Sequence, residues 1–159
     1  MDADIGVSGH ISGLWQALGC RTDDTALLSA MLAVGEPPVD DTTGRSDWMF
    51  VNSGISFDLT GGILHAVDIH LVYDRTSGFN GVTVPSWLVD DWHERPDRDT
   101  VRQTFARICG SRPSSLDLAG PRVSPTGSTG DVFESDTVAV SVVYDRRGRA
   151  MSILLGHLG

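Results

Sequence analysis

The chain of 159 residues has a net charge of -9 and a hydrophobic content of 40%, which suits one globular domain or two small halves sharing a core. Its basic residues are all arginines, and acidic residues outnumber them by 21 to 12. An acidic surface repels phosphate backbones and anionic membranes, so we expect neither nucleic acid nor membrane as a partner and favour a cationic one. No apolar run approaches the roughly 18 residues of a membrane span.

The chain starts with "MDADIGVSGH", where acidic residues stand in place of the basic residues of a secretory signal. We therefore expect a cytoplasmic protein. The absence of lysine and the excess of Asp over Glu are typical of GC-rich bacterial genomes, such as those of actinobacteria.

Two helices are predicted near the start of the chain. The segment "SGLWQAL" (12–18) is typical of one or two helical turns with an aromatic side chain packed inward. The next helix has Thr22 as its predicted N-cap and ends at Gly35, before two prolines. Because this helix is almost wholly apolar, we expect it to be more buried than its counterpart in the second half.

Alternating apolar residues after this helix predict antiparallel strands. A first strand begins at 48–51, and a hairpin follows around the turn "TGG". The residues of the hairpin that share one face are Ile55, Phe57, Leu59, Val67, Ile69 and Leu71.

The second half repeats this order. A short helix is predicted in "PSWLVDDW" (85–92), and a longer amphipathic helix has Asp97 as its N-cap and stops at Gly110. Its apolar stripe contains Val101, Phe105, Ile108 and Cys109, and its polar face contains Arg98, Arg102, Gln103 and Arg107. A strand beginning at 132–133 and a hairpin around "DRRG" follow.

The two longer predicted helices have similar sequences. "DTALLSAMLAVGEPP" (24–38) and "DTVRQTFARICGSRP" (99–113) keep Asp, Thr, Gly and Pro in register. The sequence thus predicts an α+β fold made of a tandem repeat of helix-helix-antiparallel-strand units, residues 1–74 and 75–159, with about three strands each. We expect the helices to pack on one face of the antiparallel sheet, in one compact unit.

Three local features resemble small immunity proteins found near secreted bacterial toxins: Phe79-Asn80-Gly81, Val84-Pro85-Ser86, and a helix closing at Gly110 before Pro113. The chain has Val84 where that family has leucine, and its closing loop is one residue longer. The doubled helix-helix-sheet order is also similar in architecture to β-lactamase inhibitor proteins and to the small domain of outer-membrane assembly lipoproteins. It lacks the disulfide of each inhibitor half and the lipoprotein cysteine. Both resemblances imply a protein-binding scaffold.

The best candidate for chemistry is "HAVDIH" (65–70), where Asp68 and His70 share one strand face while His65 is expected on the core side with Val67 and Ile69. Two ligands are too few for a transition metal, and a solvated strand face is the simpler interpretation. Glycine-rich phosphate loops, GxSxG and HExxH are all absent from the sequence. We therefore expect no catalytic residues, no metal and no cofactor.

Two acidic segments with tryptophans are the candidate partner-binding sites. Each can be a solvated loop or an acidic patch around aromatic anchors facing a basic protein, and "LVDDWHERPDRD" (88–99) can also be a proton-transfer site with paired carboxylates and a histidine. We adopt the protein-binding interpretation for Asp40, Asp41, Asp47, Trp48, Trp87, Asp90, Asp91, Trp92 and Glu94.

These features together predict an immunity protein that binds and neutralises a cognate cationic toxin domain, for which a nuclease is one candidate. The alternatives are a small enzyme dependent on a metal or on His and Asp, and a non-inhibitory subunit of a larger complex. The chain is expected to be a monomer or a homodimer. Cys109 is expected to be a buried free thiol, and its pairing with Cys20 stays an alternative.

Overall fold

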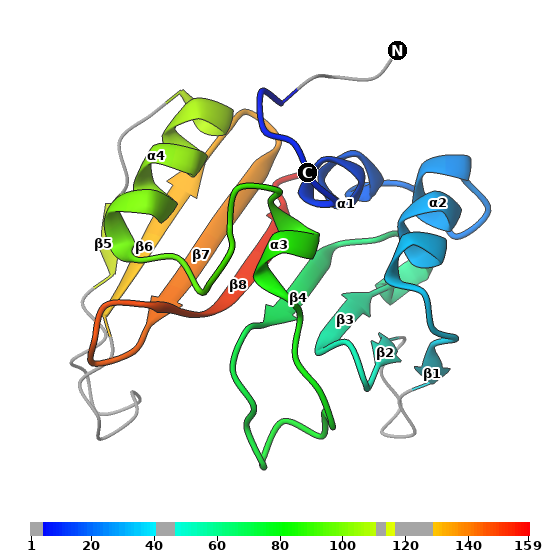
Figure 1. Ribbon diagram of the computed structural model, residues 1–159. Coiled ribbons are helices and arrows are strands. Elements are labelled where there is room, and N and C mark those ends of the chain that lie inside the picture. Colours follow the sequence, from blue (N-terminus) through cyan, green and yellow to red (C-terminus); the bar gives the residue numbers. More distant parts are fainter. Residues whose placement is uncertain (1–4, 41–46, 111–113, 117–128) are drawn as a thin grey trace.

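The computed structural model describes residues 5–40, 47–110, 114–116 and 129–159 (Figure 1). Within these ranges the chain is α+β, with four helices and an antiparallel sheet. The helices are α1 (Ile11–Ala17), α2 (Thr25–Val34), α3 (Pro85–Leu88) and α4 (Arg98–Cys109). The strands are β1 (Val39–Asp40), β2 (Asp47–Phe50), β3 (Ile55–Asp58), β4 (Ala66–His70), β5 (Ser114–Leu116), β6 (Thr129–Glu134), β7 (Val138–Tyr144) and β8 (Ala150–His157). None of the helices in these ranges is long and apolar enough to cross a membrane.

The sheet has the strand order β1-β2-β3-β4-β8-β7-β6-β5. Six longer strands form its body, and β1 and β5, of two and three residues, form its edges. The last strand, β8, pairs with β4 in the middle and so joins the two parts of the chain. Each part therefore contributes four strands, one more than predicted, because a short edge strand forms before β2 and before β6.

Both predicted hairpins are confirmed. The turn between β3 and β4 contains the 3-10 segment η1 (Thr60–Gly62), and the turn between β7 and β8 has Gly148 at a positive φ of 77°. Asp145 Oδ1 accepts hydrogen bonds from the backbone N–H groups of Arg147 and Arg149, which fixes this second turn.

The sequence signals locate the C-terminal ends of the helices more accurately than their N-terminal ends. Gly35 and Gly110 end α2 and α4 in the left-handed conformation, with φ of 83° and 67°. Asp97 caps α4 by accepting a hydrogen bond from the Thr100 N–H. The prediction of Thr22 as the N-cap of α2 is wrong, because the helix begins at Thr25 and its N-cap is Asp24, two residues later than predicted.

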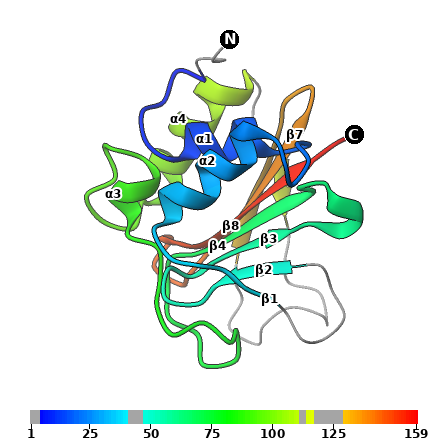
Figure 2. The ribbon, with the colours of Figure 1, turned by 90° about the vertical axis from the view of Figure 1, so that its right-hand side faces the viewer.

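The core lies between the sheet and the helices. Figures 1 and 2 show all four helices on the same side of the sheet. Strand residues alternate between buried and half-buried, as β7 does along its whole length. The buried positions form one cluster with Leu14 of α1, Leu27 of α2, and Val101 and Phe105 of α4.

The expectation that α2 is the more buried of the two longer helices is wrong. Only Leu27 and Ala30 of α2 are buried, and Leu32 is 73% exposed. The amphipathic α4 buries Val101, Thr104 and Phe105. An apolar composition does not bury a helix by itself, because burial depends on how many of its sides meet other elements.

Candidate protein-binding surface

The face of the sheet that points away from the helices is lined by alternate residues of the strands. The register aligns these residues in rows that cross the sheet. One row is Met49, Ser56, Asp68, Leu154, Ser141 and Val132, and a second is Asp47, Asp58, Ala66, Gly156, Ala139 and Glu134. We call these twelve residues the open face.

The open face combines small and apolar side chains with serines and carboxylates. Most of its side chains are small, and the second row has Ala66, Gly156 and Ala139 next to one another at its centre. Leu154, in the middle of the first row, is 43% exposed. Contiguous exposed apolar surface framed by polar residues is typical of protein interaction sites.

The charged side chains of these two rows are all acidic, and the next row on the same face begins with His70, which pairs with Ser152. Asp47 lies opposite Asp58 on neighbouring strands, Asp68 lies opposite Leu154, and Glu134 stands at the far end. Neither row contains an arginine. This arrangement places carboxylates around apolar contact area, which is the pattern expected for a basic protein partner.

Asp68 and His70 do share a strand face, as predicted. His70 Nε2 lies 3.1 Å from Asp68 Oδ2, and this hydrogen bond raises the pKa of His70 against the opposing effect of its partial burial. His65 is not on the strand: it precedes β4, and its Nε2 lies 2.9 Å from the Thr60 carbonyl oxygen. The expected core-facing position of His65 is therefore wrong, because the alternation begins only at Ala66. The described residues contain no group of three or more His, Cys, Asp or Glu side chains that could hold a metal ion.

The predicted acidic segment around residue 92 lies between α3 and α4, in the helix layer. Asp90, Asp91 and Glu94 are exposed, and Glu94 Oε1 lies 3.2 Å from Arg149 Nη1. Trp92 is only 2% exposed, so its prediction as an exposed anchor is wrong. Its ring packs edge-on against Phe105, with 6.4 Å between the ring centroids, which makes it part of the core.

Trp87 is half-buried. Its Nε1 donates to the Ala33 carbonyl oxygen over 3.3 Å, and its ring stacks on that of His10 with 4.6 Å between centroids. These contacts hold α3 against the end of α2 and the start of α1. Trp87 therefore has a structural role even where its edge reaches solvent.

The predicted acidic segment of the first half is only partly described. Asp41 and the side chain of Asp40 lie outside the described residues. Trp48 pairs with Phe57 on the core side of the sheet, and Asp47 stands on the open face. The structure thus separates Asp47 from the segment around Trp92, because the sheet lies between them.

The sequence did not identify a buried ionic cluster around Asp131. This carboxylate is 0% exposed and accepts hydrogen bonds from Arg98 and Arg102 of α4, the shortest being 2.7 Å, and from the Tyr144 hydroxyl at 2.9 Å. Burial acts to raise the pKa of Asp131, but the hydrogen bonds from Arg102, Arg98 and Tyr144 outweigh it and hold that pKa well below its usual value. The cluster fixes α4 on β6. Two arginines four residues apart on the predicted helix, together with an Asp at an inward strand position, were the available signal.

Both cysteines are free and partly buried. Burial raises the pKa of Cys109 to about 11, and it also raises the pKa of Cys20, where Asp24 adds a smaller effect.

No family model, no curated protein and no solved structure matches the chain.

Proposed function

We propose that the chain is a duplicated unit whose two halves, 1–74 and 75–159, share one sheet. The element order, two helices followed by four strands, occurs twice and supports this proposal. The strand order reads as two mirrored sets of four that meet at β4 and β8. The left-handed glycines that end α2 and α4 are 75 positions apart, Gly35 and Gly110, in agreement with the sequence alignment.

The function of this scaffold is to bind and neutralise a basic protein toxin through the open face, as an immunity protein does. The observation that carries the proposal is the combination of small and apolar side chains with carboxylates on a sheet face that lies opposite the helices. Such a face lets a partner approach the backbone closely, and Leu154 is the apolar contact at its centre.

Charge complementarity supports a cationic partner. With a net charge of -9, the chain attracts a basic protein at long range, and this attraction raises the association rate at low salt. If the toxin is a nuclease, Asp47, Asp58 and Asp68 take the places of phosphate groups in its basic cleft. The neutralised state is then a complex in which the partner's substrate is excluded.

The hydrogen-bonded Asp68 and His70 favour a second candidate function, a reaction that uses a histidine for proton transfer. The two candidates differ in what His70→Ala changes. An enzyme loses its activity, whereas a binding protein keeps its partner with a modest change in affinity.

The test is co-expression with the product of the neighbouring gene, followed by size-exclusion chromatography and calorimetry at low salt. Leu154→Arg should weaken the complex at least 100-fold, about 2.7 kcal/mol, because it places a cation in the centre of the contact. The matched control is Leu32→Arg, which changes an exposed leucine of α2 in the helix layer and should leave affinity unchanged. The absence of a complex at micromolar concentration, or equal losses in the two variants, contradicts the proposal.

A further inference from the structure

His70 stands on the same side of the sheet as the open face, in the row next to it. It follows Asp68 by two positions on β4 and pairs with Ser152 of β8, while Asp68 pairs with Leu154. His70 Nε2 lies 3.1 Å from Asp68 Oδ2, and the two side chains are 21% and 41% exposed. A titratable ring is therefore bonded to the carboxylate that lies beside the apolar centre of the proposed binding surface.

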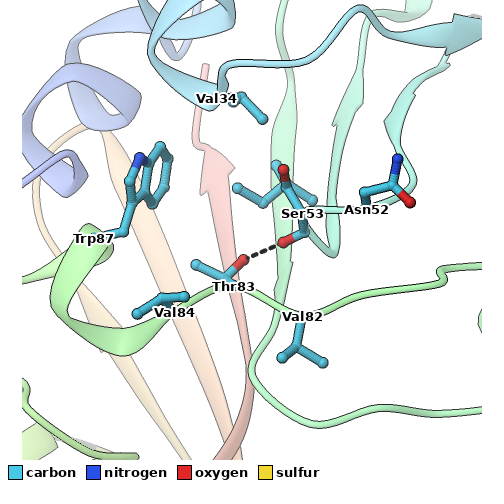
Figure 3. Close-up of a pocket in the computed structure, with 8 residues that line it drawn as sticks. Val34, Asn52, Ser53, Val82, Thr83, Val84 and Trp87 are labelled. Carbon is cyan, nitrogen blue, oxygen red and sulfur yellow. Dashed lines mark hydrogen bonds between the residues drawn. The ribbon is translucent and has the colours of Figure 1, made fainter.

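The orientation of the His70 ring is fixed by its neighbours. Phe79, in the loop between β4 and α3, packs on it with 4.8 Å between the ring centroids, and only 7% of Phe79 is exposed. This loop is attached to the sheet at Thr83, whose backbone N–H donates to the His70 carbonyl oxygen over 2.8 Å. The Thr83 hydroxyl donates to the Ser53 carbonyl oxygen over 2.7 Å (Figure 3). Because the ring is packed in this way, Nε2 stays directed at Asp68 in both protonation states.

The charged groups that act on His70 within the described part of the chain are both acidic. The hydrogen bond to Asp68 raises the pKa of His70 most, partial burial lowers it, and the charges of Asp68 and Asp74 raise it further. Asp74 Oδ1 accepts hydrogen bonds from the backbone N–H and the hydroxyl of Thr76, which keep that carboxylate in its own turn. Asp68 is thus the main partner of the His70 proton. The described residues that face His70 from neighbouring segments carry no charge: Ser152 of β8, Gly54 before β3, Phe79 and Thr83.

The pair of Asp68 and His70 has two charge states. While His70 is neutral, Asp68 presents a carboxylate to solvent, and a cation of a partner can pair with it. Once His70 is protonated, its charge compensates that carboxylate, and an approaching cation also meets the charge of the ring. A proton on His70 and a partner's cation at Asp68 therefore compete, and each weakens the binding of the other by the same factor.

We propose that His70 makes protein binding at the open face sensitive to pH: a basic partner binds while His70 is neutral and dissociates more readily once His70 is protonated. This inference rests on the proposed function, because it concerns the same surface. The direction of the pH effect follows from the competition for Asp68. Affinity is highest above the raised pKa of His70 and is lost as pH falls through that pKa.

The competition can be tested without a partner by introducing a cation opposite Asp68. Leu154→Arg places a guanidinium there, because Leu154 pairs with Asp68 across the two central strands. In an NMR titration, this variant should lower the pKa of His70 by at least about 0.5, a roughly threefold change in proton affinity, since exposed cross-strand ion pairs are weak. The matched control is Leu32→Arg, which adds the same charge in the helix layer and should leave this pKa unchanged. An unchanged pKa of His70 in Leu154→Arg, or equal decreases in the two variants, overturns the proposal.

The effect on binding is measured in the complex with the product of the neighbouring gene, by calorimetry at about pH 8.5 and about pH 5.5. The lower value is below the usual histidine pKa of about 6.5, the higher value is about two units above it, and both lie above the usual carboxylate range. The affinity of the wild type should be at least about fivefold lower at the lower pH, which is the low end of typical couplings between two ligands.

Two histidine variants show whether this loss of affinity depends on His70. His70→Gln cannot be protonated and should reduce the ratio of the two affinities below about twofold. His93→Gln, at an exposed histidine between α3 and α4, should keep the wild-type ratio. A full loss at low pH in His70→Gln, or no loss in the wild type, contradicts the proposal. Absence of a complex contradicts the proposed function, whereas the titration of Leu154→Arg tests the competition at Asp68 independently of it.

Discussion

The replacement Asp131→Asn removes the charge that holds α4 on the sheet while keeping the size of the side chain. In the native protein this carboxylate is buried and is paired with Arg98 and Arg102. The amide cannot neutralise two guanidinium groups, and the N–H donors of its NH₂ group face the N–H donors of the arginines. The variant therefore leaves two cations beside the core without their counter-charge.

The size of the expected loss of stability follows from how far Asp131, Arg98 and Arg102 are exposed to solvent. Breaking a fully buried ion pair by removing one partner costs about 3–5 kcal/mol. Here the side chains of Arg98 and Arg102 are 30% and 38% exposed, so that both recover part of their hydration. We expect a loss of about 2–3 kcal/mol in the free energy of unfolding. At about 2–4 °C per kcal/mol for a chain of this size, Tm should fall by about 4–12 °C.

The pH dependence provides a second check. Because the folded pKa of Asp131 lies below its unfolded value, the contribution is fully present above the unfolded pKa of about 3.9 and is lost as pH falls through the folded pKa. Urea unfolding should show a constant difference between wild type and variant from about pH 5 to 8, shrinking below about pH 4. Asp136→Asn, an exposed residue near the same strand, is the control. A difference under about 1 kcal/mol at pH 7, or one that persists undiminished at pH 3, refutes this account.

Three further predictions concern single side chains. Asp97→Ala removes the hydrogen bond that caps α4 and should lower the free energy of unfolding by about 1 kcal/mol. Asp23→Ala, at an exposed position before α2, should lower it clearly less, and equal losses of the two variants in urea titrations would contradict the role of the Asp97 cap. In a Cys20→Ser background, Cys109 should react with a disulfide reagent at pH 8 roughly 100-fold more slowly than in the unfolded chain, since burial raises its pKa; a rate equal to that of the unfolded chain contradicts this. Asp68→Asn should lower the pKa of His70 in an NMR titration. The wild-type pair should add under about 1 kcal/mol of stability below about pH 6.5, which is lost as pH rises through the raised pKa of His70; an unchanged His70 titration would show that Asp68 does not set it.

Local signals predicted the elements well. Gly35 and Gly110 could be predicted as helix ends because glycine readily adopts the left-handed conformation that ends a helix. Strand β7 could be predicted because its apolar residues recur at every second position. Such signals act within a few residues of one another. For this reason the hairpins, the helix ends and the α+β class could be predicted from the sequence.

Properties that depend on distant neighbours could not be predicted in the same way. Leu32 is apolar and on a helix, but no element of the described chain buries it. Trp92 was interpreted as exposed because acidic residues surround it in the sequence, yet its ring points into the core beside Phe105. Asp131 is separated from Arg98 by 33 positions, so its burial depends on which helix meets β6.

The same dependence on distant neighbours explains why the candidate binding surface lies on the sheet and not on the acidic loops that the sequence indicated. Alternation indicates that Asp68 and Leu154 stand opposite the core, but not that both occupy neighbouring positions in one row. That row exists only because β8 returns to the centre of the sheet, between β4 and β7. A binding surface formed by strand pairing is invisible until the pairing is known.

The acidic side chains of the open face also act against self-association. A sheet face with Leu154 and small residues exposed tends to stack on a second copy of itself. Two such faces would bring carboxylates together, because Asp58, Asp68 and Glu134 are present on both, and like charges disfavour that contact. The short edge strands β1 and β5 limit pairing at the ends of the sheet. If the open face is the binding surface proposed above, negative charge around its apolar centre disfavours a second copy of the chain and favours a basic protein, which is the selectivity that an inhibitor of a cationic toxin needs.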